Sequence, residues 1–425
     1  MSRQSERSAP VAGNGLFDRR QFLKAGLGTA GAGGIGLLSA TPALSQTRQT
    51  WNRFPGRGLS EAYGSPSRYE SDVARVGISA QKGTNGSGGC RTPLELLHGI
   101  ITPSGLHFER HHSGIPDIDP AKHQLLIHGH VKQPLTFSVE ALNRYPMVSR
   151  IYFLECGGNS GVMVAPEPAQ KTCGELHGLV SNSEWTGVPL KLLLEEAGIE
   201  PQGKWLIAEG ADAALMSRSI PLEKAMDDTI IALYQNGERL RPENGYPMRL
   251  LLPGWEGNMS VKWLHRIKVT DQPAMTKDET SRYSDLQSDG STLLFTYPMG
   301  VRSVITNPSA GLTMGAPGLY QISGLAWSGA GKIRQVEISA DGGKSWAEAD
   351  LEVPVLTKSF TRFNTAWQWD GSPSTLMSRA VDETGAMQPT RQVLMANRAP
   401  GSGYHYNAIV GWRIENNGEI RNIYV

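Results

Sequence analysis

Cysteine is scarce in this sequence, and the surroundings of the few cysteines exclude one common cofactor. The 425 residues contain 3 cysteines, Cys90, Cys156 and Cys173. No Cys-x-x-Cys-His run occurs, and the stretch Cys173–His177 does not fit it, so no covalent c-type haem is expected on this chain. In an oxidising compartment, an odd number of cysteines leaves at least one thiol unpaired unless it is shielded or ligated.

An excess of charge of either sign is also lacking. Lysine and arginine number 41 against 40 acidic residues, a formal net charge of +1, which argues against a nucleic-acid binder that works by bulk charge. Charged residues make up only 19%, while glycine (49) and proline (26) are plentiful, which favours a loop-rich fold with strands over a helical bundle. Beyond the N-terminus, no segment is apolar enough to span a bilayer, so no membrane association is expected.

The N-terminus resembles a twin-arginine signal peptide. Asp18–Lys24 contains Arg19-Arg20, a mild Gly/Ala-rich apolar run follows at 25–40, and Ala43-Leu44-Ser45 offers small residues for cleavage. The alternative is a membrane anchor, but the run is short and glycine-rich for a spanning helix. We therefore expect residues 1–45 to be removed and the mature protein to be periplasmic. Twin-arginine export carries folded proteins, typically those that receive a cofactor in the cytoplasm.

The remaining sequence divides into three regions by its pattern of elements. Residues 46–99 are polar and glycine-rich and form an N-terminal extension. Residues 100–285 alternate short strands and helices irregularly, which predicts an α+β domain. After a polar linker, residues 290–425 show short strands with regular turn signals and little helical periodicity, which predicts an immunoglobulin-like β-sandwich.

Local patterns predict the individual elements. Thr92–Leu97 is expected to begin a helix, with Thr92 as N-cap and Glu95 in a capping box. Further helices are expected over Phe137–Tyr145, capped by Ser138, and over Val188–Ala197, closed by Gly198. Strands are expected at Gln124–His130, Ile151–Leu154, Trp205–Ala208, Thr229–Tyr234 before an Asn236-Gly237 turn, Met248–Leu252, Gly318–Trp327, Ile333–Ser339, Ser345–Leu351, Thr365–Trp369 and Leu376–Asp382, with Trp346, Trp367 and Trp369 in the sandwich core.

Cys156 lies in the most informative stretch of the chain. The apolar run Ile151–Leu154 predicts a buried strand that leads into Glu155-Cys156 and stops at the turn Gly157-Gly158-Asn159. A cysteine at a strand end, followed by glycines that allow close approach of a ligand, suits a metal ligand or a nucleophile. The alternative is a small core residue, since free cysteine is often buried. The local pattern leaves both open.

Several motifs in order resemble the sulfite oxidase family of molybdenum enzymes, over essentially all of the mature sequence. They are LECGGNS around Cys156, Arg110-His111-His112 followed by IPDIDP, WTGVPL from Trp185, GYPMR from Gly245 with LLPGWEGNMSVKWL just after it, and EISADGGKSW and SRAVDETGAMQP in the C-terminal region. The resemblance implies a molybdopterin-binding α+β domain followed by a β-sandwich that dimerises.

The resemblance also implies roles for single residues. Cys156 matches the thiolate that binds molybdenum, and a soft thiolate suits this metal. Tyr283 matches the active-site tyrosine, and Arg249 matches the arginine that binds the pterin phosphate. The remaining implied cofactor residues are Arg110 (also counted as catalytic, with Cys156 and Tyr283), His111, His112, Lys171, Asp212, Asn244, Ser260, Val261 and Lys262. His98, His107, His123 and His128 lack ligand spacing and are expected to be structural or surface residues.

Departures from the family pattern concern the substrate. Gly161 stands where sulfite oxidases have an arginine, Glu175 replaces a pocket tryptophan, Asn244 replaces a histidine, and Arg398 is a poor match for the late substrate arginine. Fewer cationic side chains weaken the binding of a small dianion such as sulfite and open space for a larger substrate. Within the family, the stretches ECGGNS, ALYQNGE, ETSRYSDL and GYHYN are similar to those of the sulfane dehydrogenase group. That group implies a sulfane sulfur held as a persulfide on a sulfur-carrier protein.

Electrons must leave through a partner, because the sequence has no haem, nicotinamide or flavin motif. The resemblance implies a dihaem c-type cytochrome subunit, and homodimerisation through the C-terminal domain would then give a heterotetramer. Three alternatives stay open at this point: a periplasmic sulfite dehydrogenase, a molybdenum reductase acting on S-oxides, and a molybdenum-free exported binding protein. Gly161 favours sulfane over sulfite.

Overall fold

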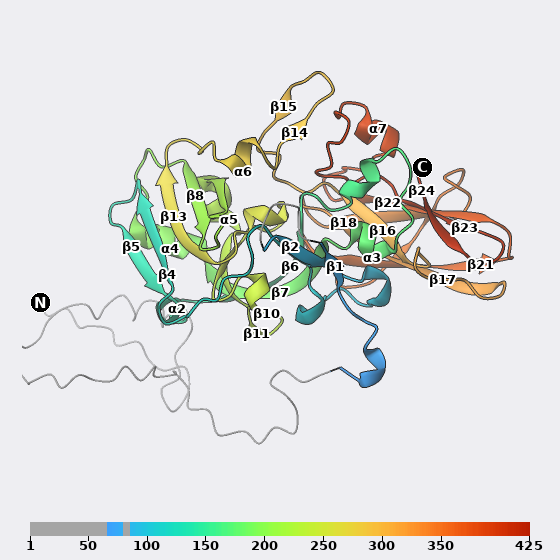
Figure 1. Cartoon of the computed structure of the whole chain (residues 1–425), viewed down its shortest axis with the longest axis horizontal. Helices are drawn as coiled ribbons and strands as arrows, with labels where there is room; N and C mark the ends of the chain where they lie inside the picture. Colours follow the sequence, from blue (N-terminus) through green and yellow to red (C-terminus); the bar gives the residue numbers. More distant parts are fainter. Residues whose placement is uncertain (1–65, 80–85) are drawn as a thin grey trace, which may run out of the picture. The chain divides into compact units, whose positions relative to one another are not determined.

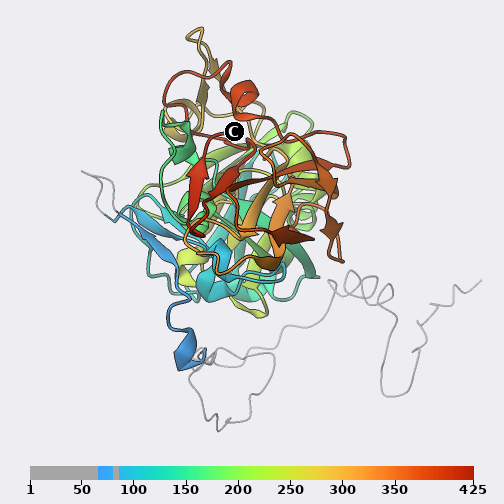
Figure 2. The ribbon, with the colours of Figure 1, turned by 90° about the vertical axis from the view of Figure 1, so that its right-hand side faces the viewer.

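The computed structural model describes residues 66–79 and 86–425 (Figure 1), and Figure 2 shows the same ribbon turned by 90°. The expected signal peptide, residues 1–45, lies outside the described residues. Contacts gather Ser67–Val425 into one compact unit. Within the described ranges, no helix is long and apolar enough to cross a membrane.

A small antiparallel sheet opens the described chain, and it corrects one helix prediction. Only a single 3-10 turn forms within Thr92–Leu97, and Thr92 does not cap it. The Thr92 hydroxyl instead donates to the Leu106 carbonyl at 3.0 Å, so a long-range contact replaces the predicted cap. The elements here are η1 (Arg68–Glu70), β1 (Val76–Ile78), β2 (Gly88–Arg91), η2 (Leu94–Leu96), η3 (Ser104–Leu106) and β3 (Glu109–His111), with strand order β1-β2-β3.

A second, five-stranded antiparallel sheet carries the cysteine stretch. Its strands are β6 (Val148–Glu155), β7 (Val180–Pro189), β10 (Ile230–Gln235), β11 (Glu238–Arg239) and β12 (Arg249–Leu251), in the order β11-β10-β7-β6 with β12 also paired to β10. Asn236 and Gly237 both have positive φ and join β10 to β11, which confirms the predicted two-residue turn. Strand β6 ends one residue before Cys156, as the apolar run predicts.

A third sheet, of mixed direction, forms the second half of the α+β domain. Its order is β5-β4-β13-β8-β9, with β4 and β13 parallel: β4 (Gln124–Gly129), β5 (Leu135–Ser138), β8 (Trp205–Gly210), β9 (Ser217–Pro221) and β13 (Leu264–Thr270). Leucines of helix α4 (Leu190–Ala197) pack into its core. Ser138 and Gly198 cap helices as predicted, but Phe137 and Val188 belong to strands, so both helices start later than expected.

Short elements connect these sheets and lead to the last part of the chain. They are α2 (Val139–Leu142), η4 (Gly161–Val164), α3 (Cys173–His177), α5 (Leu222–Asp227), η5 (Pro242–Asn244), η6 (Gly257–Met259), α6 (Lys277–Thr280), β14 (Asp285–Leu286), β15 (Thr292–Leu293) and α7 (Arg391–Met395). Strands β14 and β15 form a hairpin of their own.

The C-terminal region is a two-sheet β-sandwich, so the predicted fold class is confirmed. One sheet has the order β16-β17-β21-β20 and the other β19-β18-β22-β23-β24. The expected strand at Ser345–Leu351 is wrong in detail, because it divides into two short strands in different sheets. The strands are β16 (Arg302–Asn307), β17 (Gly318–Trp327), β18 (Ile333–Ser339), β19 (Ala347–Glu348), β20 (Asp350–Leu351), β21 (Thr361–Trp369), β22 (Ser374–Asp382), β23 (Gly411–Ile414) and β24 (Ile420–Ile423).

The sandwich core extends into the domain that carries Cys156. Trp369 is buried in this core and half-buried Trp367 packs against it, whereas Trp346 is half-buried and lies outside the cluster, which corrects one of the three tryptophan predictions. Phe153 of β6 and Cys173 of α3 belong to the same apolar cluster as the sandwich strands. The two domains therefore share buried surface.

Candidate functional site

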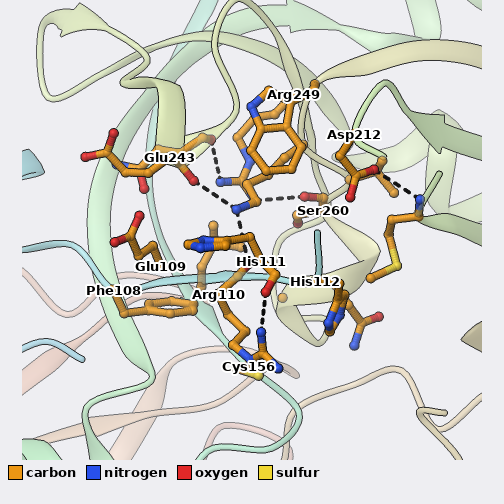
Figure 3. Close-up of a pocket in the computed structure, with 18 of the residues that line it drawn as sticks. Phe108, Glu109, Arg110, His111, His112, Cys156, Asp212, Glu243, Arg249 and Ser260 are labelled. Carbon is orange, nitrogen blue, oxygen red and sulfur yellow. Dashed lines mark hydrogen bonds between the residues drawn. The ribbon is translucent and has the colours of Figure 1, made fainter. Parts of the chain in front are cut away.

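A cavity brings the predicted site residues together (Figure 3). Every predicted site residue except Lys171 lines it. Lys171 lies outside the lining, and its half-exposed side chain pairs with Glu175 at 3.3 Å. The lining residues are His107, Phe108, Glu109, Arg110, His111, His112, Leu154, Cys156, Asp212, Met216, Glu243, Asn244, Arg249, Gly257, Asn258, Ser260, Val261, Lys262, Trp263 and Tyr283.

Cys156 reaches the cavity from the end of β6. Its backbone N–H donates to the Leu179 carbonyl at 2.9 Å, and its carbonyl accepts from the Asn159 N–H at 2.8 Å, which fixes the turn. Burial raises the pKa of the Cys156 thiol, although the Gly158 N–H opposes this by donating to the sulfur. A bound cation reverses this balance, because metal coordination deprotonates a thiol. Cys90 and Cys173 are also free thiols, and neither lines the cavity.

The glycine after Cys156 is required by space. A Cβ at Gly157 would lie 2.5 Å from Glu256 Oε2, so no larger residue fits without displacing that carboxylate. At Gly158 a Cβ would meet the Cys156 sulfur at 3.9 Å, which is an ordinary van der Waals contact. The packing therefore requires glycine at position 157 and leaves space for a side chain at position 158.

Two buried cations form the other end of the cavity, and neither is in a salt bridge within the described residues. The Arg249 guanidinium donates to backbone carbonyls, at 2.9 Å to Asn244 and 2.8 Å to Ser260, and lies 5.3 Å from the centre of the Trp185 ring. Burial lowers the pKa of Arg249 to about 9. Burial and the neighbouring Arg249 lower the pKa of Lys262 to about 7. Such a pair fits an anion, which would supply the missing counter-charge.

Tyr283 and the run Arg110-His111-His112 line the cavity at the Cys156 side. The Tyr283 hydroxyl lies 2.7 Å from His112 Nε2. Burial and the nearby Arg110 lower the pKa of His112 to about 4, so its ring is neutral near pH 7. Burial, followed by the nearby Cys156, raises the pKa of Tyr283 well above its usual range. Figure 3 shows the Arg110 guanidinium beside Cys156.

The sequence interpretation missed several lining residues. His107, expected to be structural or on the surface, is buried in the lining, and among the described residues its Nε2 has no hydrogen-bond partner. His111 Nδ1 is likewise without a partner in the described part of the chain. Buried polar atoms of this kind fit a ligand with hydrogen-bonding groups.

Gly161 lies against the backbone of the GYHYN segment. A Cβ at Gly161 would sit 3.1 Å from the Gly403 carbonyl oxygen, so this segment occupies the space beside it. The His405 N–H donates to the Gly157 carbonyl at 2.7 Å, which ties the segment to the Cys156 turn. Arg398 donates to the carbonyls of Tyr404 and His405, so this arginine holds the segment in place.

Tyr404 of the same segment lies next to Tyr283. The ring centres are 5.5 Å apart, and the Tyr404 hydroxyl accepts a hydrogen bond from the Tyr283 backbone N–H. Glu175, another departure from the family pattern, forms a capping box with Thr172 at the start of α3 and does not line the cavity. Gly161, Gly403 and Tyr404 thus pack next to the Cys156 turn without lining the cavity, and Gly161 offers no side chain where the family pattern has an arginine.

The two buried cations give a pH prediction for the protein without its cofactor. Because its pKa is about 7, Lys262 is mostly charged below pH 7. Above pH 7 its side chain must take up a proton before it can pair with an anion. Sulfate keeps its charge over this range, so its affinity should fall as pH rises above 7, by up to about tenfold per pH unit. Calorimetric titration with sulfate from pH 6 to 9 measures this.

Lys262→Gln should weaken binding at pH 6 and remove the fall in affinity between pH 6 and 8, while the fall near pH 9 that comes from Arg249 should remain. Lys277→Gln is the matched control, because Lys277 is exposed and donates to the Ala214 carbonyl outside the lining. An unchanged sulfate affinity over the whole range would show that Lys262 does not form the anion site.

The donor set fits a cofactor-held metal. No group of three or more His, Cys, Asp and Glu side chains able to hold a metal is found in the part of the chain that the structure describes. A metal at Cys156 would therefore need most of its ligands from a cofactor. The thiol at one end of the cavity and the two cations at the other suit a metal-bearing group with an anionic tail.

Comparison with known proteins agrees with this arrangement. Residues 112–277 match the family model of the oxidoreductase molybdopterin binding domain, and residues 294–409 match the Mo-co oxidoreductase dimerisation domain. An NADH nitrate reductase of Solanum lycopersicum is 31% identical over 349 residues, which cover 71% of this chain and 38% of the relative. The mitochondrial sulfite oxidase of Drosophila melanogaster is 34% identical over 280 residues, 61% of this chain and 49% of the relative. The chain thus spans less than half the length of these two relatives.

A solved structure matches over a greater length. The sulfane dehydrogenase SoxCD of Paracoccus pantotrophus superposes with a TM-score of 0.84 at 43% identity, covering 91% of this chain and 100% of that chain. Taken with the two family models, this likeness extends through both domains. The chain belongs to the sulfite oxidase family of molybdenum enzymes.

Proposed function

We propose that this protein is the molybdenum subunit of a periplasmic sulfane dehydrogenase. Its substrate would be sulfane sulfur held as a persulfide on a carrier protein, and its electron acceptor a c-type cytochrome subunit. The observation that carries the proposal is the packing of Gly161 against the Gly403 backbone. The likeness to the sulfane dehydrogenase structure supports the same assignment.

The lack of a side chain at Gly161 favours a substrate other than free sulfite. A small dianion is best held by cationic side chains that donate in pairs. Gly161 and Gly403 offer no side-chain donor, and Arg398 already donates to two carbonyls. The aromatic pair Tyr283 and Tyr404 instead offers apolar contact to the organic part of a persulfide.

The residues present fit molybdenum held by molybdopterin. Cys156 would bind the metal, and Arg249 and Lys262 would bind the phosphate, with the nearby Asn244, Ser260, Val261 and Asp212 along the wall. His107 Nε2 and His111 Nδ1 provide hydrogen-bonding positions for the pterin. When bound, this group supplies the redox chemistry that adds water-derived oxygen to sulfur.

The protein side chains control protons at the reacting end. Tyr283 keeps its hydroxyl proton, because burial raises its pKa well above its usual range, so Oη can donate a hydrogen bond into the cavity. Neutral His112, whose Nε2 lies 2.7 Å from Oη, orients that hydroxyl, and in the Nε2–H tautomer it donates to Oη and leaves the tyrosine proton free to point into the cavity. Arg110 supplies positive charge next to the thiolate and to developing negative charge on the substrate.

Partner and location complete the proposal. The Paracoccus pantotrophus sulfane dehydrogenase carries the double name SoxCD, with the letters C and D. This name supports a second subunit here. We propose a dihaem c-type cytochrome in that role, a homodimer through the C-terminal domain, and hence a heterotetramer. The match to a dimerisation domain supports the homodimer. The Arg19-Arg20 motif supports export to the periplasm.

The substrate assignment predicts a preference measurable in steady state. With the holoprotein and its cytochrome partner, kcat/KM for a persulfidated carrier should exceed that for sulfite by about 100-fold, because the dianion lacks paired cationic donors. Gly161→Arg should raise kcat/KM for sulfite above that of the steric control Gly161→Ala. High sulfite turnover with a low KM in the unmodified protein would instead establish a sulfite dehydrogenase.

Thiolate ligation predicts a spectroscopic change in Cys156→Ser. The variant should lose the sulfur-to-molybdenum absorption and all measurable activity, because a hydroxyl is a hard, weakly acidic donor. Elemental analysis and visible absorption measure this, with Cys90→Ser as the matched control outside the cavity. An unchanged spectrum would contradict ligation by Cys156.

The export assignment predicts a change of compartment. Replacing Arg19 and Arg20 by lysine should keep the full chain in the cytoplasm and unprocessed. Fractionation followed by immunoblotting measures this. Periplasmic recovery of the variant at the level of the unmodified chain would contradict twin-arginine export.

A further inference from the structure

Glu155, the residue before Cys156, is held by side chains of the C-terminal sandwich. Its carboxylate is 1% exposed. It accepts from Arg302 Nη1 at 2.9 Å and from the Trp327 indole N–H at 2.7 Å. Arg302 and Trp327 lie on β16 and β17, whereas Glu155 ends β6. A carboxylate next to the proposed metal ligand is thus neutralised by the second domain.

The same guanidinium reaches the far end of the Cys156 turn. Arg302 Nη2 donates to Ser160 Oγ, and it lies 2.9 Å from His177 Nδ1. Ser160 Oγ is also 2.7 Å from that nitrogen. Ser160 adopts a left-handed backbone conformation, with φ 61°, which a non-glycine residue keeps only when its surroundings hold it there. Arg302 therefore contacts both ends of the turn in which Cys156 lies.

This ion pair costs more than an apolar contact of the same size. Both partners are buried, 1% and 2% exposed at the side chain, and removing such charges from water costs several kcal/mol per ion. Replacement by packed apolar residues is often neutral or stabilising, so stability alone does not account for the pair. A planar guanidinium fork fixes direction as well as distance. Geometry at the Cys156 turn is the property that the pair provides.

We propose that Arg302 is a positioning residue for the Cys156 thiolate, so that the C-terminal sandwich completes the metal centre of the other domain. The fork holds Glu155 and Ser160 at a fixed separation, and the Cys156 sulfur is thereby held toward the cavity. The inference rests on ligation of the metal by Cys156 and is independent of which sulfur substrate is oxidised. It assigns the sandwich a role in the centre beyond dimerisation.

A plain cross-link between the domains is the competing explanation, and the chain offers a matched control for it. Arg362 of β21 is also buried, at 3% exposed, and it joins the sandwich to the N-terminal extension. It donates to the carbonyls of Gly99 at 2.8 Å and Leu97 at 3.2 Å, and within the described residues it makes no hydrogen bond to the Cys156 turn. Removing Arg362 therefore removes a buried arginine that links the sandwich to another region, and it spares the turn.

The test compares Arg302→Lys and Arg302→Met with Arg362→Met as holoproteins from a molybdenum-replete host. The measurements are molybdenum and pterin per chain before and after dialysis, the sulfur-to-molybdenum absorption band, and the thermal midpoint. Loss of a group that orients a metal ligand typically weakens metal binding about 10- to 100-fold. Both Arg302 variants should lose molybdenum on dialysis and show a shifted or weakened band, while pterin-phosphate contacts at Arg249 and Lys262 remain.

Arg362→Met should lower the thermal midpoint while keeping full molybdenum content and an unchanged band. Arg302→Lys keeps the charge beside Glu155 but lacks the fork that also reaches Ser160, so it is informative even if Arg302→Met does not fold. A normal band and normal molybdenum retention in folded Arg302→Lys would overturn the proposal. Suppose that Cys156→Ser loses the band while Arg302→Lys keeps a normal band and normal molybdenum retention. The ligation of the metal by Cys156 would then stand, and only the positioning role of Arg302 would be refuted.

Discussion

Positive charge that is buried without a salt bridge among the described residues is the constraint on which the rest of this structure depends. Arg249 and Lys262 are enclosed by backbone carbonyls, and burial lowers the pKa of both. A protein interior tolerates such charges only when a counter-charge completes them. The cavity that these strands enclose therefore suits a ligand with negative charge near Arg249 and Lys262. The thiol of Cys156 lies at the other end of the cavity, so a ligand that contacts both ends must span its length.

The sequence allowed the fold class and most of the cavity to be predicted, because the relevant signals are local. Cys156, the run Arg110–His112 and the segment Ser260–Lys262 each belong to one short stretch, and all line the cavity. Lys171 was misplaced because its spacing from Cys156 along the chain does not determine the direction of its side chain. The prediction of a helix capped by Thr92 was wrong for a related reason, since the Thr92 hydroxyl forms hydrogen bonds with residues distant in sequence.

Long-range contacts were beyond the sequence argument altogether. Nothing local to Arg302 indicates that its guanidinium meets Glu155, a residue on another sheet in another domain. The same holds for Gly161, whose significance was inferred from a missing arginine. Its physical partner, the Gly403 backbone, appears only when the chain is folded. Substitutions that change selectivity can thus lie far apart in sequence and act as one unit in space.

The apolar cluster shared by β6 and the sandwich has a consequence for biosynthesis. Phe153, three residues before Cys156, is buried among side chains that follow residue 298. A ribosome that has made only the first domain has therefore not yet made the surface on which this strand packs. The cysteine turn can reach its final form only after almost the whole chain has been synthesised, so a cofactor would meet a finished site only after translation, and before any export of the folded protein.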